Sequence, residues 1–204
     1  MLISDIDLLN LRKDIKTRMS EKRFQHTLAV ERMSKYLAKF LLHDRINEVC
    51  AAALLHDVAK EIPLDEQIPM LIKSGFELTE EDLETPGIIH SFTAPLIIKR
   101  DFGNFATNDI LTATLNHTVG SDNMSVFDKI IFISDYTEET RTYGSCIAVR
   151  EFLLKGFENL SDNEKLLRLN EACRLSLEAT AEAIAKSGER INSRMKMAGK
   201  SFLN

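Results

Sequence analysis

The sequence is poor in helix-breaking residues and has no disulfide pattern. Its 204 residues include four prolines and eight glycines, with no internal repeat and no low-complexity linker. Three cysteines, Cys50, Cys146 and Cys173, lie far apart and form no CxxC pair, so we expect free thiols in a reducing compartment. A chain of this length can bury enough surface to fold without a disulfide or a structural metal.

Membrane-directed segments and an excess of basic charge are also missing. No stretch approaches the ~18 apolar residues of a membrane span. Residues 1–7 have neither the basic region nor the apolar core of a signal peptide, so we expect a cytoplasmic protein with no membrane partner. The net charge of −5 argues against nucleic-acid binding. An anionic small molecule remains compatible, because a bound cation with nearby lysines and arginines can make one pocket positive.

Apolar residues recur at helical spacing along nearly the whole chain, and no segment alternates like a strand. The pattern therefore predicts an all-α fold. We expect helices over residues 5–19, 21–42 and 45–60, of which the second is capped by Ser20 and the third is capped by Asp44 and ended by Pro63. Short helices and turns should follow over 64–87, and then a helix near 90–103 that starts late or bends at Pro95. Two further helices should be capped by Thr107 and Ser125.

Two more helices are expected after about Ser145, the last of them long. This last helix would carry the basic residues Lys186, Arg190, Arg194, Lys196 and Lys200. A solvated face is our interpretation of this basic series, and contact with phosphates or with a partner is the alternative.

Histidine and aspartate gather at the inner edges or ends of the predicted helices. The residues concerned are His26, His56, Asp57, His90, His117 and Asp135. Histidines and carboxylates are costly to bury unless they are paired, hydrogen-bonded or bound to a metal. We therefore expect these six side chains to converge on one site, centred on His56 and Asp57.

A His-Asp dipeptide alone is weak support for a site, and the chain itself demonstrates this. The tetrapeptide Leu-Leu-His-Asp occurs at residues 41–44 and again at 54–57. The first copy falls between two predicted helices, where Asp44 can cap a helix, so we expect His43 to be exposed. Adjacent residues on a helix point about 100 degrees apart, so His56 and Asp57 can share a metal only near a helix end.

Imidazole and carboxylate ligands together favour Fe, Mn, Co or Zn over calcium. Such a metal can lower the pKa of bound water and neutralise phosphoryl oxygens, so hydrolysis of a phosphate ester or anhydride fits the pattern. The chain has no Gly-Lys-Ser phosphate loop and no GxSxG motif. A P-loop nucleotidase and a serine hydrolase are therefore disfavoured.

The sequence motifs around these residues resemble those of the HD-domain metal-dependent phosphohydrolases. Within that superfamily they resemble the branch of symmetrical bis(5′-nucleosyl)-tetraphosphatases. The resemblance covers about residues 15–155. It is carried by Phe24–Leu28, Ala53–Glu61, His117–Gly120, Asn123–Ser125 and Lys129–Tyr136. It implies a single compact helical bundle over 1–204, with a catalytic core at about 20–142 and C-terminal helices at about 145–204.

The resemblance also implies a reaction and residue roles. Members hydrolyse diadenosine tetraphosphate to two ADP and use iron. The metal ligands would be His26, His56, Asp57 and Asp135. Asp57, His90 and His117 would be catalytic, and the substrate phosphates would contact Lys60, His90, His117, Thr118 and Arg141. An ordinary surface position is the alternative for Lys60 and Arg141. One or two ions could bind, and the chain could form a homodimer.

One loop departs from the family pattern. Where members usually read Asp-Tyr-Ile-Glu-Pro-Gly-Arg, residues 135–141 read Asp-Tyr-Thr-Glu-Glu-Thr-Arg. Loss of the Pro-Gly turn could redirect Arg141, and Glu139 could weaken polyphosphate binding. Pro95 also replaces a usually small residue. Another nucleotide substrate (an alarmone, a cyclic dinucleotide or a nucleoside di- or triphosphate) is therefore an alternative, as is an inactive nucleotide sensor, although every expected ligand is present.

Overall fold

Helices provide all of the regular secondary structure in residues 3–202, the part of the chain that the computed structural model describes. This confirms the all-α prediction; both ends of the expected 1–204 domain lie outside the described residues. The α-helices are α1 (Asp5–Lys16), α2 (Glu21–Leu41), α3 (Ile46–Leu55), α4 (Leu64–Ser74), α5 (Glu80–Glu84), α6 (Ile89–Asp101), α7 (Asn108–Asn116), α8 (Val126–Thr137), α9 (Gly144–Leu154), α10 (Asp162–Ser187) and α11 (Ser193–Ala198).

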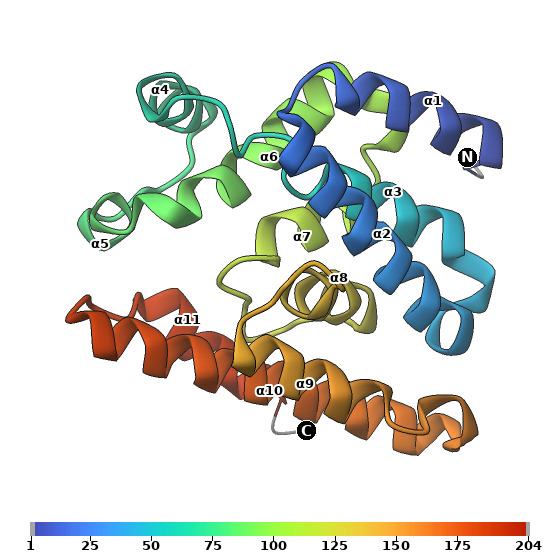
Figure 1. Cartoon of the computed structure of the whole chain (residues 1–204). Coiled ribbons are helices and arrows are strands. Elements are labelled where there is room, and N and C mark those ends of the chain that lie inside the picture. The colour runs from blue at the N-terminus through green and yellow to red at the C-terminus, as the bar shows by residue number, and fades with distance from the viewer. Residues whose placement is uncertain (1–2, 203–204) are drawn as a thin grey trace.

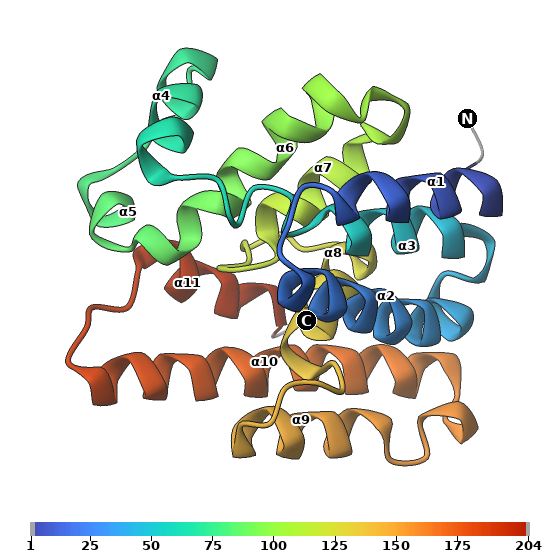
Figure 2. The same ribbon diagram turned by 45° about the horizontal axis from the view of Figure 1, so that its top comes forward.

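The long helix α2 packs against α3 and α8, and α7 packs against α6 and α8 (Figure 1). The pair α4 and α5 projects to one side, next to α6, whereas α9 and α10 lie side by side along the opposite edge (Figure 2). The main apolar core lies between α2, α3, α7, α8 and α10, and a smaller cluster joins Leu71 of α4 to Ile89 and Phe92 of α6.

Three predicted helix starts are confirmed by their caps. The side chains of Ser20, Thr107 and Ser125 each accept a hydrogen bond from the backbone N–H three residues later. Asp128 completes the predicted capping box of Ser125 by accepting from the Ser125 backbone N–H at 2.8 Å. Capping satisfies backbone donors that have no partner inside the helix, and it therefore sets where each helix begins.

The predicted third helix is wrong at both ends. A 3-10 turn over His43–Arg45 precedes α3, which begins at Ile46 without a side-chain cap, so Asp44 is not its cap. The helix ends at Leu55 instead of near Lys60, and Pro63 precedes α4. Bonds between residues three apart, such as Lys60 N–H to Asp57 C=O at 2.9 Å, tighten the chain into turns after Leu55. Likewise α6 starts before His90 and continues through Pro95, so of the two alternatives, a late start or a bend at Pro95, the late start is wrong.

The C-terminal region forms three helices where two were predicted, and the last one is short. Gly188 ends α10 with a φ of 79°, in the left-handed region that favours glycine. The chain then folds back to α11, and Arg194 pairs with Asp82 on α5 at 2.9 Å. Arg190 lies in the turn between these helices, so the predicted long basic helix does not exist.

The composition-based expectations can also be checked. All three cysteines are buried and free, as predicted. Within residues 3–202, no helix has the length and the apolar content needed to cross a membrane.

Candidate metal centre

Six predicted site residues, which come from five separate segments, meet in one buried cluster. His26 lies on α2, His56 and Asp57 directly after α3, His90 in the first turn of α6, His117 directly after α7 and Asp135 on α8. His56 is 0% exposed and Asp57 is 4% exposed. The structure therefore brings together the residues that the sequence predicts as ligands.

The Asp57 carboxylate lies at the centre of the cluster, and its two oxygens face different histidines. Oδ2 lies 3.5 Å from His56 Nε2 and 3.8 Å from His26 Nε2. Oδ1 lies 3.2 Å from His90 Nε2 and 3.6 Å from His117 Nε2. This arrangement gives Asp57 the position of a carboxylate that can bridge two halves of one site.

Two histidines lie just beyond helix ends, where a local hydrogen bond fixes the ring. His56 Nδ1 donates to the Ala53 carbonyl at 2.7 Å, and His117 Nδ1 donates to the Thr114 carbonyl at 2.7 Å. A carbonyl oxygen can only accept, so the hydrogen must be on Nδ1. In the neutral rings, Nε2 therefore carries a lone pair directed into the cluster, which is the form that binds metals.

His26 lies between two carboxylates. Its Nδ1 is 3.1 Å from Glu138 Oε1, and its Nε2 is 3.1 Å from Asp135 Oδ1. Burial opposes the charged ring, but the carboxylates of Asp135 and Glu138 outweigh that effect and raise the pKa of His26 to about 9. A proton on His26 therefore balances part of the negative charge of the two carboxylates.

The pKa values of Asp57, Asp135 and His90 are shifted toward the forms that bind cations. Burial opposes ionisation of Asp57, yet His56, His117 and His90 hold its pKa well below its usual range. The pKa of Asp135 is held low in the same way, against burial, by His26 and Arg141. Burial lowers the pKa of His90 to about 4, so its ring is neutral near pH 7.

The three polar residues expected near the substrate phosphates also lie at the cluster. Lys60 Nζ is 3.3 Å from the Gly87 carbonyl and 3.3 Å from the His90 ring. Thr118 Oγ1 lies 3.3 Å from His90 Nε2. Arg141 Nη2 donates to Asp135 Oδ1 at 2.5 Å. Lys60 and Thr118 are thus on the His90 side of Asp57, and Arg141 is on the His26 side.

Sequence reasoning assigned no role to two residues that the structure places in contact with the cluster. Arg23 Nη1 donates to Asp57 Oδ2 at 2.6 Å, and the buried carboxylate of Glu138 contacts His26. Helical spacing carried a usable signal, since Arg23 precedes His26 by three residues and Glu138 follows Asp135 by three, and residues three apart share a helix face.

The altered loop keeps its arginine at the site and directs the extra carboxylate away. Glu139 pairs with Arg32 on the exposed side of α2 and does not line the cavity beside the cluster. His43 is exposed, as predicted, with its side chain 77% accessible.

The donor set fits a divalent metal. The Nε2 atom of His56 is buried and has no hydrogen-bond partner within residues 3–202, whereas that of His26 faces the Asp135 carboxylate at 3.1 Å. Ligand atoms lie within 4.8 Å of one another in three overlapping sets: His26 with His56 and Asp57, Asp57 with His90 and His117, and His56 with His117 and Asp135. Buried imidazole nitrogens and carboxylate oxygens this close together are the ligands that a borderline cation requires.

Comparison with known proteins places this helical metal centre in a class. Residues 23–140 match the HD domain family. A protein of Halalkalibacterium halodurans named symmetrical bis(5′-nucleosyl)-tetraphosphatase is 30% identical over 138 residues, which cover 67% of this chain and 71% of the relative. A Bacillus subtilis protein of the same name is 28% identical over 138 residues, covering 67% and 72%.

The likeness extends to three dimensions. A crystal structure from Clostridium acetobutylicum, described as a predicted HD superfamily hydrolase involved in NAD metabolism, superposes with a TM-score of 0.79 at 26% identity and covers 95% of both chains. The chain therefore belongs to the HD domain family, in the group of relatives named symmetrical bis(5′-nucleosyl)-tetraphosphatases. It is a hydrolase of that family.

Proposed function

We propose that this protein hydrolyses a dinucleoside tetraphosphate at its central phosphoanhydride, converting diadenosine tetraphosphate and one water into two ADP. The buried cluster centred on Asp57 carries the proposal, because it joins a complete histidine and aspartate donor set to cationic side chains. The names of the relatives supply the substrate class.

We assign the metal to His26, His56, Asp57 and Asp135, with iron as the first candidate and Mn, Co or Zn as alternatives. The bound ion would activate a water molecule and neutralise charge on phosphoryl oxygens. Asp57 orients the attacking water through its carboxylate. Arg141 is suited to bidentate contact with phosphate.

The His90 side of Asp57 supplies the remaining contacts. Lys60 places an ammonium group 3.3 Å from the His90 ring, and Thr118 adds a hydroxyl at 3.3 Å from Nε2. These groups can bind phosphoryl oxygens as negative charge develops on them. The Nδ1 bond to the Thr114 carbonyl holds the His117 ring so that Nε2 faces the cluster. That geometry favours a second ion between Asp57, His90 and His117.

Product identification tests the reaction. Metal-loaded protein is incubated with diadenosine tetraphosphate, and the nucleotides are separated by ion-exchange chromatography. ADP as the sole product supports symmetrical cleavage, whereas ATP with AMP would overturn it. Faster hydrolysis of an alarmone, a cyclic dinucleotide or a nucleoside triphosphate in the same assay would assign a different substrate.

Elemental measurement on protein purified without added metal tests the proposed centre. Iron at one or two ions per chain is the expected content. If two ions bind, the His117→Ala variant should lose one of them, and an unchanged content would remove His117 from the ligand set.

A further inference from the structure

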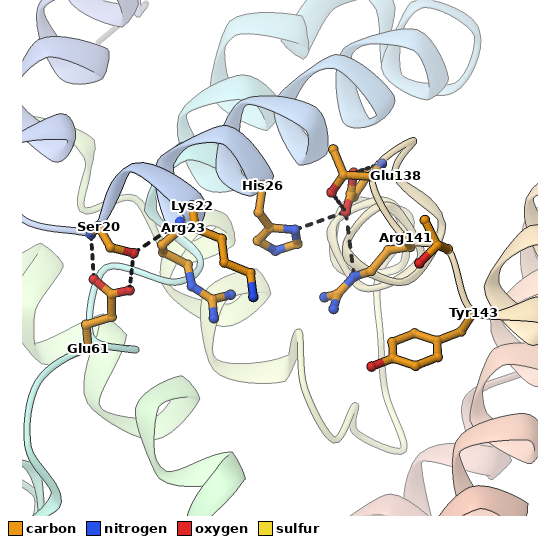
Figure 3. Close-up of a pocket in the computed structure, with 10 residues that line it drawn as sticks. Ser20, Lys22, Arg23, His26, Glu61, Glu138, Arg141 and Tyr143 are labelled. Carbon is orange, nitrogen blue, oxygen red and sulfur yellow. Dashed lines mark hydrogen bonds and ion pairs between the residues drawn. The ribbon is translucent and has the colours of Figure 1, made fainter.

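A cavity of about 550 Å³ opens beside the His26 side of the cluster (Figure 3). One wall is the first turn of α2, with Lys22 and Arg23, and the opposite wall is the segment between α8 and α9, with Arg141 and Tyr143. His26 also lines the cavity, so the space is continuous with the candidate metal centre. The residues identified on the His90 side of Asp57 are not part of it.

Three cationic side chains reach this cavity, and the acidic residues of its walls are already engaged. Figure 3 shows Lys22, Arg23 and Arg141 extending into the space from the two walls. Glu61 accepts hydrogen bonds from the backbone and hydroxyl of Ser20, each at 2.6 Å. Lys22 forms no ion pair within residues 3–202, so its ammonium group is available to an anion.

Tyr143 gives the cavity an exposed aromatic edge. Its residue is 73% exposed, and it directly precedes α9. The segment before it is held in place, because Arg150 donates to the Glu138 carbonyl at 2.7 Å and Glu138 accepts from the Thr140 backbone N–H at 2.5 Å. An exposed aromatic ring beside cationic groups has the chemistry that stacks on a nucleobase whose phosphates are bound nearby.

Symmetrical cleavage sets a further requirement. The central phosphoanhydride must lie at the cluster, so one nucleoside with its phosphates must extend to each side of Asp57. The Oδ1 side faces His90 and His117, and the Oδ2 side faces His26 and Arg23. Only the second side leads into the cavity with Lys22 and Tyr143.

We propose that this cavity binds one nucleoside half of the substrate, with the base stacked on Tyr143 and the adjoining phosphates held by Lys22, Arg23 and Arg141. This inference rests on the proposed function, since it assigns a place to the second half of a dinucleotide. It makes Tyr143 and Lys22 determinants of the preference for dinucleotides over mononucleotides.

The test compares two substrates with equal phosphate chains, diadenosine tetraphosphate and adenosine 5′-tetraphosphate, in wild type, Tyr143→Ala and Tyr143→Phe. Loss of a base–aromatic stack should lower kcat/KM for the dinucleotide on the order of tenfold. The mononucleotide can place its single base on the Oδ1 side of Asp57, so its kcat/KM should change by less than about twofold. Tyr143→Phe keeps the ring and should behave as wild type. Equal losses on both substrates, or no loss on either, would overturn the subsite.

Lys22→Ala extends the test to the phosphates, with Lys39→Ala as its matched control. Both lysines are exposed on α2, but Lys39 lies at the far end of the helix. We expect the Lys22 variant to bind the dinucleotide several-fold more weakly, with a smaller salt dependence than wild type, and the Lys39 variant to be unchanged. Equal behaviour of the two variants would remove Lys22 from the subsite.

Binding of a methylene-bridged, non-hydrolysable analogue of diadenosine tetraphosphate separates this inference from the proposed reaction. If wild type cleaves no dinucleotide but binds the analogue, and Tyr143→Ala weakens that binding about tenfold, the reaction fails and the subsite stands. Cleavage with equal analogue affinity in both proteins would leave the reaction standing and overturn the subsite. No analogue binding by wild type would overturn the subsite directly.

Discussion

The tetrapeptide Leu-Leu-His-Asp occurs twice, and its two copies have opposite surroundings. At residues 41–44, the side chains of His43 and Asp44 are 77% and 83% exposed and lie 3.0 Å apart. At residues 54–57, His56 and Asp57 are buried among ligands from four other segments. Each copy spans the C-terminal end of a helix, since α2 ends at Leu41 and α3 ends at Leu55.

The difference between the copies lies in what each helix end faces. The end of α2 reaches the edge of the molecule, where His43 pairs with its neighbour Asp44; such an exposed pair contributes little to stability. The end of α3 points between α2, α7 and α8, which contribute further histidines and a second carboxylate. Helix ends allow both residues to face one point, but only convergence with other elements makes a metal site.

The largest loss of activity is expected when the aspartate of the buried copy loses its charge. The same change in the exposed copy is the control. Asp57→Asn removes the carboxylate whose two oxygens face four histidines, and Asp44→Asn makes the same change at the surface. We expect the Asp57 variant to lose activity by on the order of 10³-fold, because the proposed metal binding and the proposed orientation of water both depend on that charge. Initial rates with diadenosine tetraphosphate and metal content per chain measure this.

The Asp44 variant should keep activity and metal content within about twofold of wild type. Full activity in Asp57→Asn would show that the reaction takes place elsewhere, and the contrast between the two copies would then have no functional meaning.

A smaller effect is expected from the carboxylate behind His26. Glu138→Gln retains an acceptor for His26 Nδ1 but removes the buried charge, and Glu139→Gln makes the same change at the exposed neighbour that pairs with Arg32. Partners behind metal ligands typically contribute 10–100-fold to metal affinity. We therefore expect the Glu138 variant to bind metal at least about tenfold more weakly, measured by competition with a chelator.

Glu139→Gln should bind metal like wild type. If the two glutamate variants weaken binding equally, the effect comes from net charge and not from the contact with His26. The distinction between buried and exposed histidine–carboxylate pairs would then be lost.

Local signals made much of the fold predictable. Helical spacing predicted the all-α class, and Ser20, Thr107 and Ser125 marked helix starts because capping is local. The position of α11, where the chain folds back after Gly188, was not predictable in this way. It depends on contacts such as Arg194 with Asp82, which lie 112 residues apart in sequence. A continuous basic pattern therefore suggested one long helix where the chain turns at Gly188.

At the candidate site, inward-facing positions could be read from the sequence, but mutual geometry could not. The apolar stripe on α2 indicated that His26 faces inward. The division of the Asp57 oxygens between two groups of histidines depends on how α2, α6 and α7 meet, and no spacing along the chain encodes it. Glu138 lies just past the end of α8, where a carboxylate is usually solvated, whereas here His26 and Thr140 bind it.

Asp82 is an aspartate that is buried but lies outside the candidate site, so its role can be compared with that of Asp57. It is buried like Asp57 but lies outside the cluster, where it accepts from Arg194 Nε at 3.0 Å and Nη2 at 2.9 Å. Burial opposes its ionisation, but the bonds from Arg194, Thr79 and Asn192 lower the pKa of Asp82 to about 2. We expect Asp82→Asn to lower the free energy of unfolding at pH 7 by about 2 kcal/mol, without changing metal content.

The pH dependence follows from the direction of that shift. A carboxyl whose pKa is lower in the folded state than its usual 3.8 stabilises the fold above about pH 4, and the contribution is lost as pH falls toward 2. Urea unfolding at pH 7 and at pH 2–4 should therefore show a gap between wild type and Asp82→Asn that narrows with acid, while Asp44→Asn stays within about 0.5 kcal/mol of wild type. If the difference in the free energy of unfolding stayed constant with pH, packing and not charge would explain it. If the Asp82 variant lost metal, the position of the C-terminal segment would affect the candidate metal centre.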